Sequence, residues 1–145
     1  MPGPKNIPVI FPALIVPNSY LSGGCLRRHE QMSDLFVDSW GTGSRVVLVR
    51  GSLATGSEEW QAQRPLADEG FHLLVLDRRG YGKSPVAEGE DFLRDADDIA
   101  ELMGDSAHLV GHSYGGLGVL FAAARRPDAI RGVVPASDSG WQRCF

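Results

Sequence analysis

Short apolar runs recur along the chain and are separated by segments rich in glycine, proline and charged residues. The runs lie at residues 46–49, 72–77, 109–110 and 130–134. Apolar runs of this length, bounded by turn residues, are typical of strands covered on both faces of a sheet. Ahead of them, apolar and polar residues alternate at 35–40 before a glycine-rich turn at 41–43. This alternation predicts an edge strand with a hairpin-like connection to the next strand.

The segments between the runs predict helices. Residues 57–60 have the composition of a capping-box-like helix start. A further helical piece follows, with Pro65 in its first turn and Gly70 at its end. Apolar residues then recur at helical spacing over 92–103, and an apolar run at 117–122 predicts another helix. Helices therefore alternate with strands.

An acidic set accompanies the helix predicted at 92–103. Its members are Asp91, Asp95, Asp97, Asp98 and Glu101. The set could mark a metal site or the solvated face of the helix. We favour the solvated face, because a charged outer side is the default for an amphipathic helix.

The alternation of strands and helices predicts the fold class. Consecutive strands joined through helices run parallel and connect by right-handed crossovers, which gives an α/β, doubly wound, mostly parallel sheet with helices on both faces. The carboxyl ends of parallel strands meet at one edge of such a sheet, where ligands bind. Residues 50–55, 77–84 and 111–115 are expected to lie together at that edge.

The third apolar run leads into a Gly-x-Ser-x-Gly box at 111–115, with Ser113 at its centre. The box could occur by chance, since the chain has 18 glycines among 145 residues. Its context argues otherwise, because a strand precedes it and a helix follows. Such a turn holds the serine in a strained conformation, with its hydroxyl exposed and backbone N–H groups nearby. Ser113 is therefore the candidate nucleophile.

Composition narrows the possible functions. The chain is 43% hydrophobic and 22% charged, which suits one globular domain. A formal net charge of −4, with no basic stripe, argues against a nucleic-acid partner. Cys25 and Cys144 have neither metal-ligand nor C-x-x-C spacing. Because eighteen consecutive apolar residues occur nowhere, we expect no membrane span and a cytoplasmic protein.

The two ends of the chain differ from the middle. Residues 1–31 contain five prolines around an apolar segment, residues 32–136 carry the periodic pattern, and residues 137–145 have no period. The first segment could be a secretory signal. It could instead be a disordered leader, or sequence ahead of the natural start, with Met32 as the true first residue. We favour this second interpretation over a signal, because prolines interrupt the apolar segment. We expect a domain at 32–136 and an irregular tail.

Three segments together resemble the α/β-hydrolase fold family: VLVRGSLATGSEEW, VLDRRGYGKSP and LVGHSYGG. Their order and spacing match the family over residues 35–134. The resemblance implies a serine hydrolase that acts on a small-molecule ester or related acyl bond, with no metal and no cofactor. It also implies that Ser113 is the nucleophile. The backbone N–H of Tyr114 and that of Ser52, or of Leu53 as a fallback, would then form the oxyanion hole.

The resemblance assigns supporting roles to other polar residues. His112 precedes the nucleophile and points in a different direction from it, so we expect a structural role for His112. The loop at 77–84 resembles the family's structural turn, and its charged residues are assigned to loop packing and capping. Arg50 stands where the family commonly has His. Because Arg is larger and permanently charged, the neighbouring loop could be displaced, or the Arg could be only a local variant.

A larger departure concerns the catalytic histidine. In this family the acid and the histidine follow the serine along the chain, yet no histidine follows His112. His29, His72 and His108 lie in the leader or at strand starts. Asp138 is a possible acid. We therefore expect an amino-terminal fragment of a serine hydrolase, or alternatively a non-catalytic remnant or pseudoenzyme. Neither the substrate nor the oligomeric state follows from the sequence.

Overall fold

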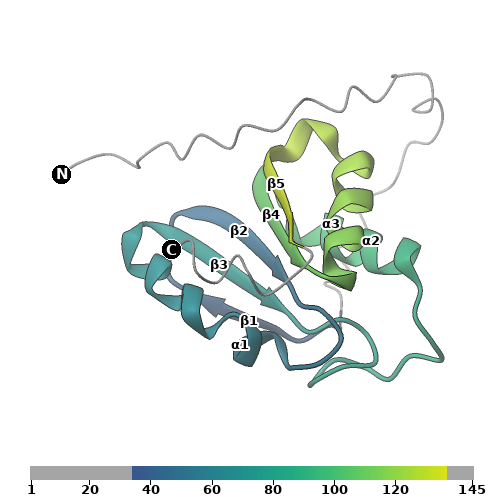
Figure 1. The fold of residues 1–145 in the computed structure, drawn as a ribbon. Coiled ribbons are helices and arrows are strands. Elements are labelled where there is room, and N and C mark those ends of the chain that lie inside the picture. Colours follow the sequence, from purple (N-terminus) through teal and green to yellow (C-terminus); the bar gives the residue numbers. More distant parts are fainter. Residues whose placement is uncertain (1–33, 137–145) are drawn as a thin grey trace.

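The computed structural model describes residues 34–136, which form a single five-stranded sheet flanked by helices (Figure 1). The strands are β1 (Val37–Trp40), β2 (Ser44–Val49), β3 (Phe71–Leu76), β4 (Ala107–His112) and β5 (Ile130–Ala136). The helices are α1 (Gly56–Glu59), α2 (Phe92–Leu102) and α3 (Tyr114–Arg125), with 3-10 segments η2 (Gln61–Glu69) and η3 (Pro127–Ala129). The predicted leader and tail lie outside the described residues.

The strand order is β1-β3-β2-β4-β5, and every pair is parallel except β1 with β3. The predicted parallel α/β sheet is therefore confirmed. β1 is an edge strand as predicted, but the hairpin-like connection is wrong, because β1 pairs with β3 and not with its successor β2. β2 already has parallel neighbours on both sides, β3 and β4. No edge of β2 remains for an antiparallel partner.

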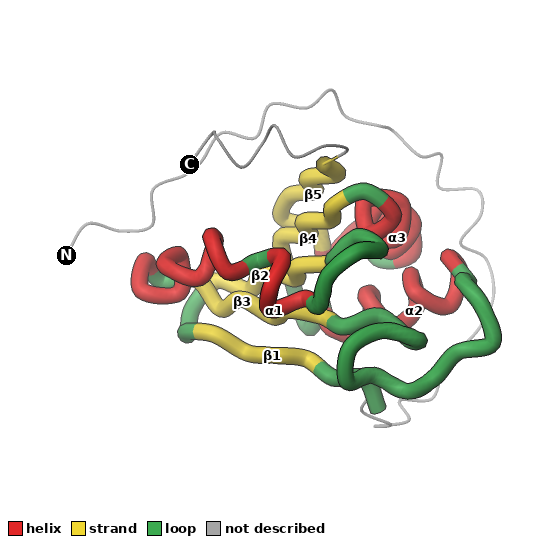
Figure 2. The backbone as a smooth tube through the Cα atoms, turned by 60° about the horizontal axis from the view of Figure 1, so that its bottom comes forward, coloured by secondary structure: helices red, strands yellow, loops and turns green. Residues whose placement is uncertain are grey.

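Helices cover both faces of the sheet (Figure 2). One face packs under α2 and α3, and its cluster includes Val47, Leu74 and Leu109. The other face packs against η2 and includes Leu48 and Val75. Successive residues of β2 and β3 thus point into different clusters, because side chains alternate across a strand. This double covering explains why their sequences are continuously apolar.

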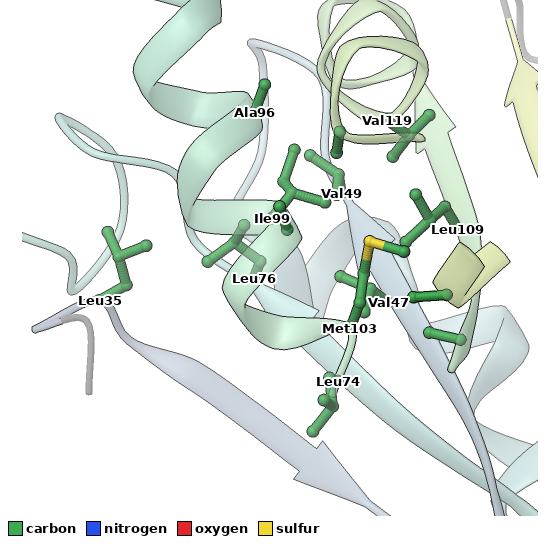
Figure 3. Close-up of a cluster of buried hydrophobic side chains, with 14 residues drawn as sticks. Leu35, Val47, Val49, Leu74, Leu76, Ala96, Ile99, Met103, Leu109 and Val119 are labelled. Atoms are coloured by element: carbon green, nitrogen blue, oxygen red, sulfur yellow. The ribbon is translucent and has the colours of Figure 1, made fainter. Parts of the chain in front are cut away.

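The cluster under α2 and α3 is shown in Figure 3. Ile99 and Met103 extend from the α2 side toward Val47 and Val49 of the central strand, and all four side chains are completely buried. Val119 adds the contribution of α3. The spacing of Ile99 and Met103 is the helical period that predicted α2.

β5 is less covered than its sequence predicts. The run at 130–134 was expected to be buried, but residues of β5 are half-buried or exposed. Within the described residues β5 pairs only with β4 and forms an edge of the sheet. The apolar residues of β5 therefore have a neighbouring strand on one side only.

Two helix starts and one helix end test the capping predictions. α1 begins at Gly56 and is capped by Thr55, whose capping box with Glu58 replaces the start expected at residues 57–60. The hydroxyl of Thr55 satisfies the backbone N–H of Glu58, an arrangement that stabilises a first turn. Gly70 ends η2 in the left-handed conformation at φ 87°, as predicted. Asp91 caps α2.

The acidic set on α2 is not a uniformly solvated face. Asp95 and Asp98 are buried, with 6% and 7% exposure, which corrects the prediction for these two residues. Asp95 pairs with Arg78, and Asp98 accepts two hydrogen bonds from Arg79. Two arginines from the loop after β3 provide the compensating charge that buried carboxylates need. Within residues 34–136, no group of three or more His, Cys, Asp or Glu could hold a metal ion.

None of the helices in the described part of the chain is long and apolar enough to cross a membrane. The longest, α3, has 12 residues, whereas about 20 apolar residues are needed to span the hydrocarbon core.

Candidate active site

Ser113 lies at a sharp bend between a strand and a helix. β4 ends at His112 and α3 begins at Tyr114, so Ser113 alone forms the junction. Its backbone has φ 53° and ψ −119°, and it is the one non-glycine residue with positive φ between residues 34 and 136. Such conformations cost about 1–3 kcal/mol and persist only where the surrounding structure imposes them. The residue is exposed.

The glycines of the box are required by close packing. A methyl group on Gly115 would lie 2.5 Å from the carbonyl oxygens of Val49 and Arg50, at the end of β2. A methyl group on Gly111 would overlap the carbonyl oxygen of Gly115. The bend therefore packs in direct contact with the backbone at the end of β2. This contact holds Ser113 in its strained conformation.

The loop after β2 lies beside Ser113. A methyl group on Gly51 would be 3.3 Å from the Cβ of Ser113. The next two residues, Ser52 and Leu53, are exposed. The structure thus brings together the loops that carry Ser113 and Ser52, which are 61 residues apart in the sequence.

Several backbone N–H groups around the bend already have acceptors. The amide of Ser113 donates to the carbonyl oxygen of Ala136 at 2.6 Å. The amide of Gly51 donates to both carboxylate oxygens of Glu59, at 3.1 Å each. Tyr114 differs, because it is the first residue of α3 and its amide has no acceptor within the helix. The positive end of the helix dipole adds to the field there.

Glu59 also contacts the residue that precedes Ser113. Its Oε1 lies 2.9 Å from Nδ1 of His112. The Glu59 and His112 side chains are 11% and 26% exposed. One carboxylate therefore joins the loop after β2 to the end of β4. This contact is compatible with the supporting role expected for His112.

A second set of contacts surrounds Tyr114. Arg78 forms a buried ion pair with Asp95 at 3.0 Å, and its Nη2 donates to the carbonyl oxygen of Gly51 at 3.4 Å. The same guanidinium lies 4.0 Å from the ring centroid of Tyr114, which stacks on Phe92 at 4.2 Å. Arg78 therefore joins α2, the loop after β2 and the start of α3.

Burial perturbs two acidic groups in this set. Burial raises the pKa of Asp95, opposed by the hydrogen bond and charge of Arg78. Burial, reinforced by the charge of Asp95, raises the pKa of the Tyr114 hydroxyl. This hydroxyl is buried and has no hydrogen-bond partner among residues 34–136. Removing solvent from charged groups is the common cause.

Arg50 is almost completely buried, with 2% exposure. Its guanidinium lies 4.4 Å from the ring centroid of Tyr81. Burial and the neighbouring Arg78 cation lower the pKa of Arg50. Gly51 nevertheless lies against Ser113. The bulk of Arg50 is accommodated inside the protein while the loop remains beside the bend.

The loop at 77–84 is held mainly by Asp77. Its carboxylate accepts hydrogen bonds from the amides of Gly56 at 2.8 Å and Lys83 at 3.2 Å. The hydroxyl of Ser84 donates to the backbone carbonyl of Asp77. These contacts are those of loop packing and helix capping.

The remaining histidines of the described chain lie away from Ser113. His72 and His108 are near the starts of β3 and β4, at the opposite edge of the sheet. His72 hydrogen-bonds Ser39 at 2.8 Å. Within residues 34–136, no side chain hydrogen-bonds the hydroxyl of Ser113. Asp138, the possible acid, lies outside the described residues.

The sequence did not predict the roles of two residues at the site. Glu59 was assigned only to a helix start, and Asp95 only to a solvated face. A signal for Glu59 was present in the sequence: the capping box needs only one glutamate, Glu58, so the adjacent Glu59 is not explained by it. For Asp95, no local pattern distinguishes a buried carboxylate from its exposed neighbours.

Ser113 lies in a strand-bend-helix geometry at the carboxyl edge of a parallel sheet, and this arrangement defines a class of protein. Residues 45–139 match the family described as alpha/beta hydrolase fold. The chain belongs to this family.

Relatives with assigned names are similar to part of the chain. A non-heme chloroperoxidase, CPO-A1, of Kitasatospora aureofaciens is 39% identical over 89 residues, which cover 57% of this chain and 32% of that protein. A bifunctional esterase/perhydrolase, DCH, of Acinetobacter calcoaceticus is 37% identical over 102 residues, 66% of this chain and 37% of that protein. This chain therefore matches about a third of the length of these curated relatives.

A solved structure agrees with the fold. A thermophilic esterase from Thermogutta terrifontis superposes with a TM-score of 0.63 at 35% sequence identity, over 68% of this chain and 38% of that chain.

Proposed function

We propose that this chain carries the nucleophile of a serine hydrolase acting on an ester or related acyl bond of a small molecule, with Ser113 as nucleophile. The observation that carries the proposal is the strained, exposed Ser113 at the start of α3. An esterase among the relatives and another among the structural neighbours support the substrate class. Neither a metal nor a cofactor takes part in the proposed reaction.

In the proposed reaction the Ser113 oxygen forms a bond to the acyl carbon. The hydroxyl proton passes to a general base, and the base returns it to the departing alcohol when the ester C–O bond breaks. Water then hydrolyses the acyl-serine. The negative charge on the tetrahedral intermediate requires N–H donors aimed at it.

Tyr114 and the loop after β2 are the proposed sources of those donors. The amides of Ser113 and Gly51 already have acceptors. The amide of Tyr114 has none within α3. We therefore propose Tyr114 as one oxyanion donor and Ser52 as the other, with Leu53 as the fallback. Loss of a single donor of this kind typically costs about 3 kcal/mol of transition-state stabilisation.

A non-catalytic protein is the second candidate. It is favoured by one observation, that the hydroxyl of Ser113 makes no side-chain hydrogen bond within residues 34–136. A serine without a base is a weak nucleophile, and loss of a triad member leaves only about 10³–10⁴-fold acceleration over water.

Labelling with a fluorophosphonate probe separates the two candidates. The full 145-residue chain, its Ser113→Ala variant and a Ser44→Ala control are compared for covalent labelling and for hydrolysis of p-nitrophenyl acetate. Ser44 begins β2 at the opposite edge of the sheet. Labelling of the unmodified chain and of Ser44→Ala, but not of Ser113→Ala, supports the hydrolase. Equal labelling of all three, or of none, supports the non-catalytic protein.

A further inference from the structure

We infer that Glu59 is a positioning residue, which fixes the loop that bears one of the proposed oxyanion donors against the bend that bears the nucleophile. This inference rests on the proposed function of Ser113. In this role a single carboxylate sets the distance between two proposed catalytic elements that come from distant parts of the sequence.

The contacts of Glu59 are arranged for this role. Both carboxylate oxygens accept from the amide of Gly51 at 3.1 Å, and Oε1 also lies 2.9 Å from Nδ1 of His112. Gly51 immediately precedes Ser52, and His112 immediately precedes Ser113. Each of the two proposed catalytic residues is therefore one peptide unit away from a group held by the same side chain.

The chemistry of Glu59 suits its two partners. A carboxylate accepts hydrogen bonds, which matches the Gly51 amide and an Nδ1–H of His112. The Glu59 carboxylate also attracts the buried Arg50 cation. Hydrogen bonds to an ionised group are about twice as strong as those between neutral groups. The link is accordingly stronger than an amide or hydroxyl could provide.

The backbone that carries Glu59 is itself held in place. The amide of Gly56, at the start of α1, donates to the buried carboxylate of Asp77 at 2.8 Å. Trp60, which follows Glu59, is completely buried against the sheet. Glu59 therefore extends from a short segment anchored on both sides. A site that must hold its geometry to a fraction of an ångström needs such support.

The contact with Gly51 has a second consequence. Gly51 lies beside the bend, since a methyl group on it would be 3.3 Å from the Cβ of Ser113. Because Glu59 accepts the hydrogen bond of the Gly51 amide, Gly51 cannot donate to a developing oxyanion, and the donor must come from another residue of the loop. Glu59 thus also selects which amide serves the reaction.

The test compares Glu59→Gln and Glu59→Ala with a matched control, Glu58→Gln. Glu58 is the neighbouring exposed glutamate and belongs to the capping box of α1. The control removes a neighbouring negative charge of α1 while leaving Glu59 intact, and glutamine can replace glutamate in a capping box. Any effect of Glu59 that is merely the loss of a negative charge on α1 would appear in the control as well.

The first readout is the labelling of Ser113 at several fluorophosphonate concentrations, which separates the maximal labelling rate from probe binding. Small misplacements of reacting groups cost up to about a hundredfold in rate. We expect Glu59→Ala to lower the maximal rate by roughly tenfold to a hundredfold with little change in half-saturating probe concentration. Glu59→Gln, whose amide oxygen still accepts from Gly51, should lose less.

The second readout is the amide proton resonance of Gly51 in an ¹⁵N-labelled sample. A hydrogen bond to a carboxylate moves this resonance downfield. We expect it to shift upfield in Glu59→Ala and Glu59→Gln and to stay unchanged in Glu58→Gln.

The outcomes separate the inference from the function on which it rests. If the unmodified chain is not labelled at Ser113, the proposed function fails, and the positioning role fails with it. If the unmodified chain is labelled and both Glu59 variants match its rate, only the positioning role is overturned. If Glu59→Ala does not fold, as judged by thermal melting, Glu59→Gln decides. A rate reduced below that of Glu58→Gln supports the role, and an equal rate overturns it.

Discussion

The two edges of the sheet, which are formed by the opposite ends of its parallel strands, contain different kinds of structure. At the carboxyl edge, Arg50, Asp77 and Arg78 are buried, and Ser113 has a strained backbone. At the amino edge, His72 is half-buried and shares a hydrogen bond with the exposed Ser39. The positive φ angles found there, as at Gly70, belong to glycine.

The difference shows where the fold tolerates unfavourable features. Buried charges and a strained residue each lower stability unless neighbouring groups compensate. At the carboxyl edge the compensation spans several elements: Arg78 alone contacts α2, the loop after β2 and the start of α3. Such concentrations of strain and perturbed titratable groups are typical of functional sites. The amino edge has the ordinary turns of a structural support.

The largest expected effect comes from breaking the charge pair at the carboxyl edge. Arg78→Met leaves Asp95 buried without its cation and should lower the free energy of unfolding by about 3–5 kcal/mol. Arg131→Met, at the amino edge, removes an exposed arginine that donates to Ser106, and should change it by no more than about 0.5 kcal/mol. Urea denaturation of both variants measures the contrast. Equal losses would show that the two edges do not differ in this respect.

A smaller effect is expected from relieving the strain at Ser113. Ser113→Gly adopts positive φ freely, so it should recover part of the 1–3 kcal/mol of strain, reduced by the greater entropy that glycine loses on folding. Ser113→Ala keeps a Cβ. We therefore expect the free energy of unfolding of Ser113→Gly to be about 1 kcal/mol higher than that of Ser113→Ala. Thermal melting of the two variants provides the comparison. A glycine variant no more stable than the alanine variant would contradict strain at this position.

The smallest effect concerns a histidine at the amino edge. Burial, followed by the charge of Arg131, lowers the pKa of His108 below 6.5. The folded state therefore prefers neutral His108, so its stabilising contribution is complete above pH 6.5 and is lost as the pH falls through the depressed pKa. His108→Gln should flatten the decline in melting temperature over that acidic range, compared with a His72→Gln control. An unchanged decline would contradict the shift.

Much of the fold could be predicted because its signals are local. The apolar runs gave β2, β3 and β4, and the helical spacing of Ile99 and Met103 gave α2. The bend at Ser113 followed from five consecutive residues between a strand and a helix. These features depend on steric and packing preferences that a few neighbouring residues satisfy among themselves.

The rest involved partners that are far apart along the chain. Asp95 looked like any exposed acid of α2, and its burial depends on Arg78, 17 residues away. The antiparallel partner of β1 depends on which strands occupy the two sides of β2. Sequence patterns report how a residue suits its own element and do not report which distant residue faces it.

The sequence by itself determined the order of strands and helices, the bend at Ser113 and the edge of the sheet where chemistry could take place. Only the tertiary structure decided that Glu59 meets His112, 53 residues away, and that Arg78 is buried against Asp95. The physical reason is that periodicity and turn chemistry act over a few residues, whereas desolvated charges are stable only beside partners that the packing of the whole sheet brings to them.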